Sequence, residues 1–214
     1  MLLIPSGIQN IIFDLGGVII HLDTGLTFEA MGRLGGLSRQ EAEALAASEA
    51  CFFQYERGEI SPEQFFDSLR RLLKTETASE QLIEAWNAML LHIPPQNLEV
   101  LRQLRKRYKL FMLSNTNTVH IEEVHRRLQL VSGEADFSAY FEQVYYSQDI
   151  GARKPEPAAF RTILDQWELR PEETLFIDDN AANLLGAQQL GIKTLLFPAN
   201  GDLTALLEYG SEHT

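Results

Sequence analysis

The sequence predicts an α/β fold, in which a doubly wound, mainly parallel sheet carries helices on both faces and is interrupted by an all-helical insert. Short apolar runs that end in polar residues recur along the chain, at residues 11–14, 110–114, 143–147, 174–179 and 194–198. Between the later runs, apolar residues such as Phe160, Ile163 and Trp167 follow the helical period. Strands that alternate with helices are typical of βαβ units, which build Rossmann-like parallel sheets.

The first two strands are separated by an unusually long segment. One strand ends at Asp14 and the next convincing one begins near Leu110, whereas connections in compact domains usually span a few residues. Within this segment, residues 61–73 begin with a Ser-Pro capping signal and then place apolar side chains on one helical face. The prediction divides the chain into a core of residues 1–20 and 93–214 and a helical insert of residues 21–92.

Composition and charge exclude several classes of partner. The chain has 214 residues and a net charge of −12, which disfavours binding to a nucleic-acid backbone. It lacks an apolar run of roughly 18 residues, the length that suggests a membrane span. The N-terminus lacks the basic region and long apolar run of a secretory signal, so we expect a cytoplasmic protein. The one cysteine, Cys51, cannot form an internal disulfide.

Polar side chains stand where several of the predicted strands end. In an open parallel sheet, ligands bind at the carboxyl ends of the strands, near the point where the strand order reverses. We therefore expect these side chains to converge on one edge of the sheet. They are Asp14 after the first strand, Ser114 and Asn115 after the second, Lys154 past the third, and Asp178 and Asp179 after the fourth.

This set of residue types favours phosphate chemistry assisted by a metal. Three neighbouring carboxylates repel one another unless a proton or a cation lies between them. Mg²⁺ is a hard cation that prefers oxygen ligands, and Lys154 and Ser114 are suited to phosphate oxygens. Asp14 is then available as a nucleophile. Taken singly, each residue reads as an ordinary turn or helix cap; their order and their strand-end placement carry the inference.

Four motifs resemble those of the haloacid dehalogenase superfamily of phosphatases. They read FDLGGV, MLSN, RKPEP and FIDDNAAN, and the resemblance covers essentially the full chain. The longer stretches LSNTNTVH, YYSQDIGARKPEP and FIDDNAANLLGAQQLGI are similar to a sugar-phosphatase subgroup that includes α-D-glucose-1-phosphate phosphatases. By position, the insert corresponds to the helical cap of that superfamily.

The resemblance implies a metal site around the first and fourth motifs. It makes Asp14 both the nucleophile and a metal ligand, with the main-chain carbonyl of Gly16 and the carboxylate of Asp179 as further ligands. Asp178 would act in or next to the metal shell, supported by Asn183. The implied cofactor is Mg²⁺.

The resemblance also implies a substrate site. Ser114 and Lys154 would hold the transferring phosphoryl group, together with Asn115. In the insert, YERGEIS resembles a substrate-facing turn, so Glu56 and Arg57 are candidate specificity residues, although a solvated turn is an equally good interpretation. The expected partner is a small phosphate ester.

Gly16 departs from the pattern of the superfamily. Most of its phosphatases carry an aspartate two residues after the nucleophile, where it protonates the leaving group and activates water. General acid–base catalysis contributes roughly 10²–10⁴-fold, or about 3–5 kcal/mol of barrier. The similar subgroup lacks the same aspartate, which implies a slower or more selective enzyme. Substitute acids could be His21, Asp23, Glu56 or His120, although an ordinary surface role is the simpler reading of each.

The predicted function is a Mg²⁺-dependent phosphatase that hydrolyses a small sugar phosphate, such as a sugar 1-phosphate, through an aspartyl-phosphate on Asp14. A second hypothesis is a metal-independent 2-haloacid dehalogenase, against which the pair Asp178 and Asp179 argues because carboxylates beside the nucleophile need a cation. A third is a catalytically weak phosphate-binding or regulatory protein, for which Gly16 is the main support.

Overall fold

Five parallel strands form the centre of the protein, in the order β3-β2-β1-β4-β5. The computed structural model describes residues 4–207, so the outermost residues of the predicted core, 1–3 and 208–214, lie outside the described residues. The strands are β1 (Asn10–Phe13), β2 (Lys109–Ser114), β3 (Gln143–Tyr146), β4 (Thr174–Asp178) and β5 (Lys193–Leu196). Each one lies within the predicted run or starts one residue before it, and the predicted α/β class is confirmed.

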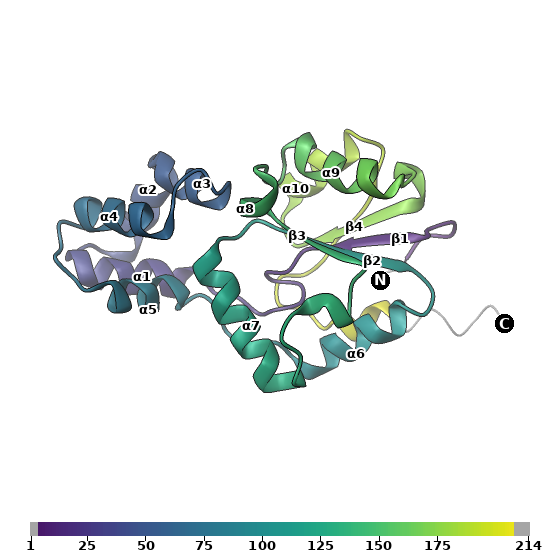
Figure 1. Ribbon diagram of the computed structural model, residues 1–214, viewed down its shortest axis with the longest axis horizontal. Helices are drawn as coiled ribbons and strands as arrows, with labels where there is room; N and C mark the ends of the chain where they lie inside the picture. The colour runs from purple at the N-terminus through teal and green to yellow at the C-terminus, as the bar shows by residue number, and fades with distance from the viewer. Residues whose placement is uncertain (1–3, 208–214) are drawn as a thin grey trace.

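Helices cover both faces of the sheet because alternate strand residues point to opposite sides. Ile11 and Phe13 pack in one apolar cluster with α6 and α7, whereas Ile12 packs in a second cluster with α9 and α10 (Figure 1). The helices on these faces are α6 (Pro95–Leu104), α7 (Thr118–Ser132), α9 (Pro157–Trp167) and α10 (Ala181–Gln188), and the short α8 (Ser147–Ile150) follows β3.

The strand order puts the switch point at β1. The chain runs from β1 to β2 and β3 on one side, and then crosses to β4 and β5 on the other. Ile11 of β1 is in register with Leu110 of β2 and with Leu175 of β4, so the carboxyl ends of these three strands lie side by side. Ligand sites in open α/β sheets form at this position.

Five helices lie between β1 and α6, and we name them the helical segment. They are α1 (Thr24–Gly35), α2 (Arg39–Ser48), α3 (Ala50–Glu56), α4 (Pro62–Leu73) and α5 (Ser79–Asn87). The predicted capping signal is present: the Ser61 hydroxyl accepts from the Gln64 amide, and the Gln64 side chain accepts from the Ser61 amide. Phe65 and Trp86 belong to an apolar cluster that the segment forms largely from its own residues. The domain boundaries stay a prediction.

Two linkers join the helical segment to the sheet, and they pair with each other. Leu22 and Leu90 form an antiparallel bridge, and the amide of His21 donates to the carbonyl of His92 at 2.9 Å. The Asn200 side chain bonds both main-chain groups of Leu22, at 2.8 and 2.9 Å. The entry and exit of the segment are therefore held together at one edge, to the left of the sheet in Figure 1.

Candidate active site

Asp14 directly follows β1, at the centre of the sheet edge. Its amide donates to the carbonyl of Ile177 on β4, which continues the ladder by one bond and fixes the position of the Cα atom. Its carboxylate Oδ1 accepts from the amide of Leu15 at 2.6 Å and from the Lys154 ammonium at 2.7 Å. The residue is 8% exposed, so a buried carboxylate lies at the switch point, as the sequence predicts.

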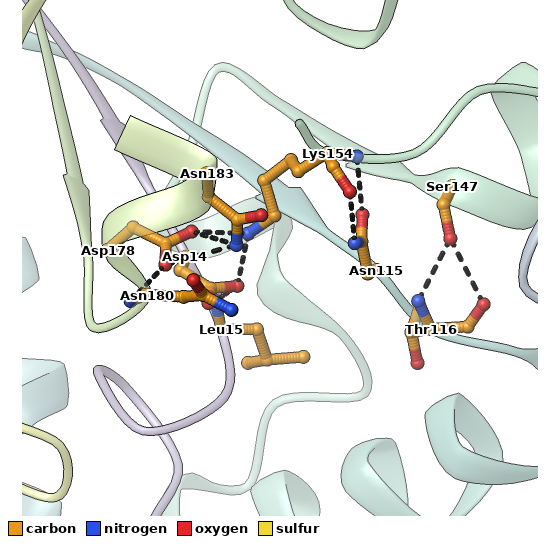
Figure 2. A network of polar contacts seen from close by, with 9 residues as sticks. All are labelled: Asp14, Leu15, Asn115, Thr116, Ser147, Lys154, Asp178, Asn180 and Asn183. Carbon is orange, nitrogen blue, oxygen red and sulfur yellow. Dashed lines mark hydrogen bonds and ion pairs between the residues drawn. The ribbon is translucent and has the colours of Figure 1, made fainter. Parts of the chain in front are cut away.

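Lys154 joins the first and fourth motifs. Its Nζ lies 2.7 Å from Oδ1 of Asp14 and 2.9 Å from Oδ2 of Asp178. Asp178 is fully buried, and its carboxylate also accepts from the amide of Asn180 at 2.7 Å and from the Asn183 side chain at 3.0 and 3.2 Å (Figure 2). Asn183 therefore supports Asp178, as the resemblance implies.

Asp14, Asp178 and Asp179 form what we name the acidic cluster. Each offers one carboxylate oxygen, and these three atoms lie within 4.8 Å of one another. Burial, together with the charges of Asp178 and Asp179, raises the pKa of Asp14 to about 7, against the opposing effect of Lys154. Burial and the charge of Asp178 raise the pKa of Asp179. Three crowded carboxylates beside one ammonium leave excess negative charge, which suits a divalent cation with oxygen ligands.

The two glycines after Asp14 each leave room for a neighbouring side chain. Gly17 has φ of +72°, and a Cβ atom there would lie 2.2 Å from Oδ2 of Asp179. Only glycine therefore allows the Asp179 carboxylate to lie over the backbone at this point. A Cβ atom on Gly16 would instead meet the end of the Leu22 side chain, at 2.4 Å. The resemblance assigns a role to Gly16 alone, whereas the structure shows one for Gly17 as well, whose signal in the sequence is the second glycine of FDLGGV.

Asn115 holds the main chain of Lys154. Its side-chain carbonyl accepts from the Lys154 amide at 2.8 Å, and its NH₂ group donates to the Lys154 carbonyl at 2.9 Å (Figure 2). Burial alone would lower the pKa of the Lys154 ammonium, but Asp14 and Asp178 raise it above its usual value. Ser114, at the end of β2, is buried and lines the cavity beside Lys154. Phosphoryl binding by Ser114, Asn115 and Lys154 stays a prediction.

The candidate substitute acids each have another partner. Nε2 of His120 donates to the carbonyl of Trp86 at 3.1 Å, and its Nδ1 accepts from the Asn117 side chain at 3.1 Å. Burial lowers the pKa of His120 to about 4, so an ordinary surface role is the wrong interpretation of this residue. Asp23 caps α1 by accepting from the Gly25 amide at 2.9 Å.

The other two candidate acids are His21, in the linker before α1, and Glu56, at the end of α3. The His21 ring lies edge-on to His92, with the ring centroids 4.6 Å apart, and burial followed by the neighbouring His92 lowers the pKa of His21. Glu56 accepts from Nε of Arg153 at 2.6 Å. Each of the four candidates therefore has a structural contact.

A cavity of about 780 Å³ begins at the acidic cluster and extends to the helical segment. Glu56 lines it, whereas Arg57 pairs with Glu156 instead. The specificity roles predicted for both residues stay predictions. The walls from the helical segment are mainly apolar and include Phe28, Ala46, Phe52, Phe53 and Trp86.

Comparison with known proteins identifies the family. Residues 8–191 match haloacid dehalogenase-like hydrolases. The chain belongs to this family. It is therefore an enzyme of the hydrolase class, as the motifs predict.

Similar proteins within this hydrolase family cover nearly the whole chain. A D-ribitol-5-phosphate phosphatase of Bacteroides thetaiotaomicron is 29% identical over 94% of this chain and 98% of its own. A crystal structure of a family enzyme from the same organism, in complex with magnesium and inorganic phosphate, is 34% identical with a TM-score of 0.82, over 91% of this chain and 96% of that one. A predicted family hydrolase from Porphyromonas gingivalis is 32% identical with a TM-score of 0.81, over 92% and 94%.

In the part of the chain that the structure describes, no helix combines the length and apolar character needed to cross a membrane.

Proposed function

We propose that this hydrolase is a phosphatase that cleaves a small phosphomonoester, with Asp14 as the nucleophile. The observation that carries the proposal is the acidic cluster beside the buried Lys154, at the inner end of a cavity large enough for an organic leaving group. The similar proteins support it, because one is named for phosphatase activity and another was crystallised with inorganic phosphate.

The cofactor is Mg²⁺, and the donor set of this chain fits it. Asp14, Asp179 and the Gly16 carbonyl would hold the ion, with Asp178 in or beside its shell. The ion supplies positive charge to the carboxylates and to the phosphoryl oxygens. Burial and neighbouring carboxylates raise the pKa values of Asp14 and Asp179, and a hard cation bound by their oxygens would offset both effects.

Each side chain of the site then has its own role in the reaction. An oxygen of the Asp14 carboxylate attacks phosphorus, the bond from phosphorus to the ester oxygen breaks, and water later hydrolyses the aspartyl-phosphate. Lys154 and Ser114 bind the phosphoryl oxygens, while the Asn115 amide holds the main chain of Lys154. With glycine at position 16, the departing oxygen takes its proton from solvent, from the substrate, or from a group not yet identified.

Two kinds of leaving group are candidates. The absence of an acid at Gly16 favours a sugar 1-phosphate, because an anomeric oxygen leaves more easily than a simple alkoxide. The relative named as a D-ribitol-5-phosphate phosphatase supports a primary ester of a polyol instead. Both are small phosphate esters, and a cytoplasmic location, which stays a prediction, would suit either.

A panel of phosphate esters, assayed with Mg²⁺ and with EDTA, tests this function. The panel contains a hexose 1-phosphate, a hexose 6-phosphate, ribitol 5-phosphate and p-nitrophenyl phosphate, and 2-chloropropionate probes the dehalogenase alternative. We expect Mg²⁺-dependent release of phosphate from at least one ester and no release of chloride. Halide release that survives EDTA would favour the dehalogenase. Binding of inorganic phosphate without turnover of any ester would favour the silent phosphate-binding protein.

A further inference from the structure

Two ion pairs cross between the helical segment and the turn that carries Lys154. At the end of α3, Glu56 accepts from Nε of Arg153 at 2.6 Å. The next residue, Arg57, pairs with Glu156. Arg153 and Glu156 flank Lys154, so each side of this contact offers one cation and one anion. We name these four residues the latch.

The latch is more sheltered than an ordinary surface pair. The side chains of Glu56 and Arg153 are 28% and 21% exposed, and those of Arg57 and Glu156 are 29% and 35% exposed. By contrast, the pair Arg33–Glu29 within α1 has side chains that are 71% and 53% exposed. The guanidinium of Arg153 also lies over the ring of Phe53, 4.8 Å from its centroid. Reduced exposure and a second contact strengthen such pairs over isolated surface ones.

The main chains also approach closely at this contact. Gly58 directly follows Glu56 and Arg57 and has φ of +67°. A Cβ atom on Gly58 would lie 2.4 Å from the carbonyl oxygen of Gln148 in α8. The end of α3 therefore packs directly on the sheet domain, a name we use for the sheet and the helices that cover it, and α3 and α8 are neighbours in Figure 1.

The turn on the sheet side is a fixed anchor. The amide of Glu156 donates to the carbonyl of Arg153 at 2.8 Å, which closes the turn. Between them, the main chain of Lys154 is held by both amide atoms of Asn115, and its ammonium is held by two carboxylates. These contacts come from the sheet domain alone, so Lys154 does not need the latch to stay beside Asp14.

The helical segment is thus attached at two places. The paired linkers at Leu22 and Leu90 tie its entry and exit together, and the latch fixes the end of α3 on the sheet domain. Phe52 and Phe53 of α3 line the cavity, and so does Glu56 of the latch. The position of α3 therefore determines the wall that a leaving group meets.

We propose that Glu56, Arg57, Arg153 and Glu156 are positioning residues, which dock α3 over Asp14 and so set the affinity for the organic part of the ester without holding its phosphoryl group. The proposal rests on the phosphatase function. It gives Arg57 a different task from the substrate contact that the sequence suggests, because its partner is Glu156.

Arg57→Glu tests the latch, with p-nitrophenyl phosphate as substrate and inorganic phosphate as inhibitor. Undocking lowers the fraction of enzyme with a complete leaving-group wall, so the apparent affinity for the ester falls while saturating substrate restores the docked state. We expect KM to rise roughly tenfold, the effect of losing the Arg57–Glu156 pair and of placing two carboxylates opposite each other. We expect kcat to change less than about threefold, and the inhibition constant of phosphate to stay within about twofold.

Charge exchange separates docking from a substrate contact. Adding Glu156→Arg to Arg57→Glu recreates the pair with reversed sign, so we expect KM to return to within about threefold of the parent value. Arg57→Met, which removes the charge with little change of bulk, should give an intermediate KM. Arg33→Glu makes the same charge change on α1 and should leave KM unaltered. If Arg57 contacts substrate directly, Glu156→Arg will not rescue the variant, and the proposal fails.

Small-angle X-ray scattering tests the docking without using activity. The radius of gyration should be larger for Arg57→Glu than for the parent and should return in the exchanged double variant. If the parent protein hydrolyses no ester but its variants show this pattern, the phosphatase function fails and the latch stands. If activity is present and Arg57→Glu leaves both KM and the radius of gyration unchanged, the latch is wrong.

Discussion

Asp14 and Asp179 of the acidic cluster line the same cavity as the Trp86–Asn117–His120 group, but the two groups differ in how fully their polar atoms and charges are paired. In the second group, the Trp86 indole donates to the Asn117 side chain at 3.3 Å, and the two nitrogens of His120 bond Asn117 and the Trp86 carbonyl. The rings of Trp86 and His120 stack, with their centroids 4.8 Å apart. In the acidic cluster, burial and neighbouring carboxylates raise the pKa values of Asp14 and Asp179.

This difference distinguishes a polar group that stabilises the fold from one that binds a ligand. A buried polar group whose hydrogen bonds are complete stabilises the fold and binds nothing further. A buried group with excess charge costs folding free energy and recovers it when a ligand of opposite charge binds. Burial and polarity are common to both groups, so neither property identifies the active site by itself.

Asp14→Asn should have the largest effect. The variant keeps the shape of the side chain and removes the anionic nucleophile, so phosphatase activity should fall by roughly 10⁴-fold or more. In metal-free buffer the same variant should unfold at a higher temperature than the parent, because the ionised carboxylate is opposed by burial and by its acidic neighbours. Phosphate release and thermal unfolding, with and without Mg²⁺, measure both effects.

Two results would contradict this account of Asp14. Turnover near the parent rate would mean that water attacks phosphorus directly. If the metal-free variant unfolds at a lower temperature than the metal-free parent, the charges of the acidic cluster are already balanced without a metal, as the hydrogen bonds of the His120 group are. Asp165→Ala, which removes an exposed carboxylate from α9, is the control for the general loss of one negative charge.

His120→Gln should change how stability depends on pH. Burial keeps His120 neutral in the fold, with a pKa of about 4 against 6.5 for an ordinary histidine. Between these values the unfolded chain binds the proton and the folded protein does not, so folding stability is lost as the pH falls from 6.5 towards 4. The contribution amounts to about 3 kcal/mol.

Urea unfolding of the parent and of His120→Gln, at several pH values, measures this contribution as a difference. Glutamine offers an NH₂ donor group and a carbonyl acceptor, which can replace the donor and acceptor nitrogens of the neutral imidazole, and it does not titrate. We expect the parent to lose more stability than the variant on acidification. Equal losses of stability would show that His120 is protonated in the fold and is available as an acid. The His120 group would then not differ from the acidic cluster in this respect.

The sequence predicts the acidic cluster better than the His120 group, for a physical reason. Asp14 and Asp178 each stand at the end of an apolar strand, and parallel strands bring their carboxyl ends together whatever the loops do. His120, Trp86 and Asn117 meet only because α5 packs against α7, and no local pattern encodes that contact. The sequence does not predict the latch either, because Arg57 and Glu156 are 99 residues apart and no local pattern links them.

Asp179→Ala should weaken the binding of Mg²⁺. Asp179 contributes one of the three oxygens in the cluster, lies over Gly17 and lines the cavity together with Asp14. Loss of one carboxylate should lower the affinity for Mg²⁺ at least tenfold, measured by titration calorimetry of the metal-free protein. Asp165→Ala should bind Mg²⁺ as the parent does. Binding that is unchanged in Asp179→Ala, or absent from the parent at millimolar Mg²⁺, would place the metal elsewhere or remove it.

Gly16→Asp should have the smallest effect, and it acts only on substrates with poor leaving groups. The parent lacks an acid at this position, so its rate should rise steeply with the acidity of the departing oxygen, and p-nitrophenyl phosphate should exceed a hexose 6-phosphate or ribitol 5-phosphate. An aspartate at position 16 donates the missing proton and should raise the rate for the two primary esters roughly tenfold while leaving the aryl ester unchanged.

The rates of Gly16→Asp can be interpreted only if the new aspartate side chain fits beside Leu22. The new Cβ atom meets the far end of Leu22, 2.4 Å away, and a flexible side-chain end can move aside. Gly16→Asn makes the same steric demand and cannot supply a proton, so a gain with Asp that Asn lacks isolates the acid. If the parent already hydrolyses all these esters at similar rates, another residue supplies the proton. The partners seen for His120, Asp23 and Glu56 would then make His21, whose ring nitrogens are the least constrained by these contacts, the first residue to replace.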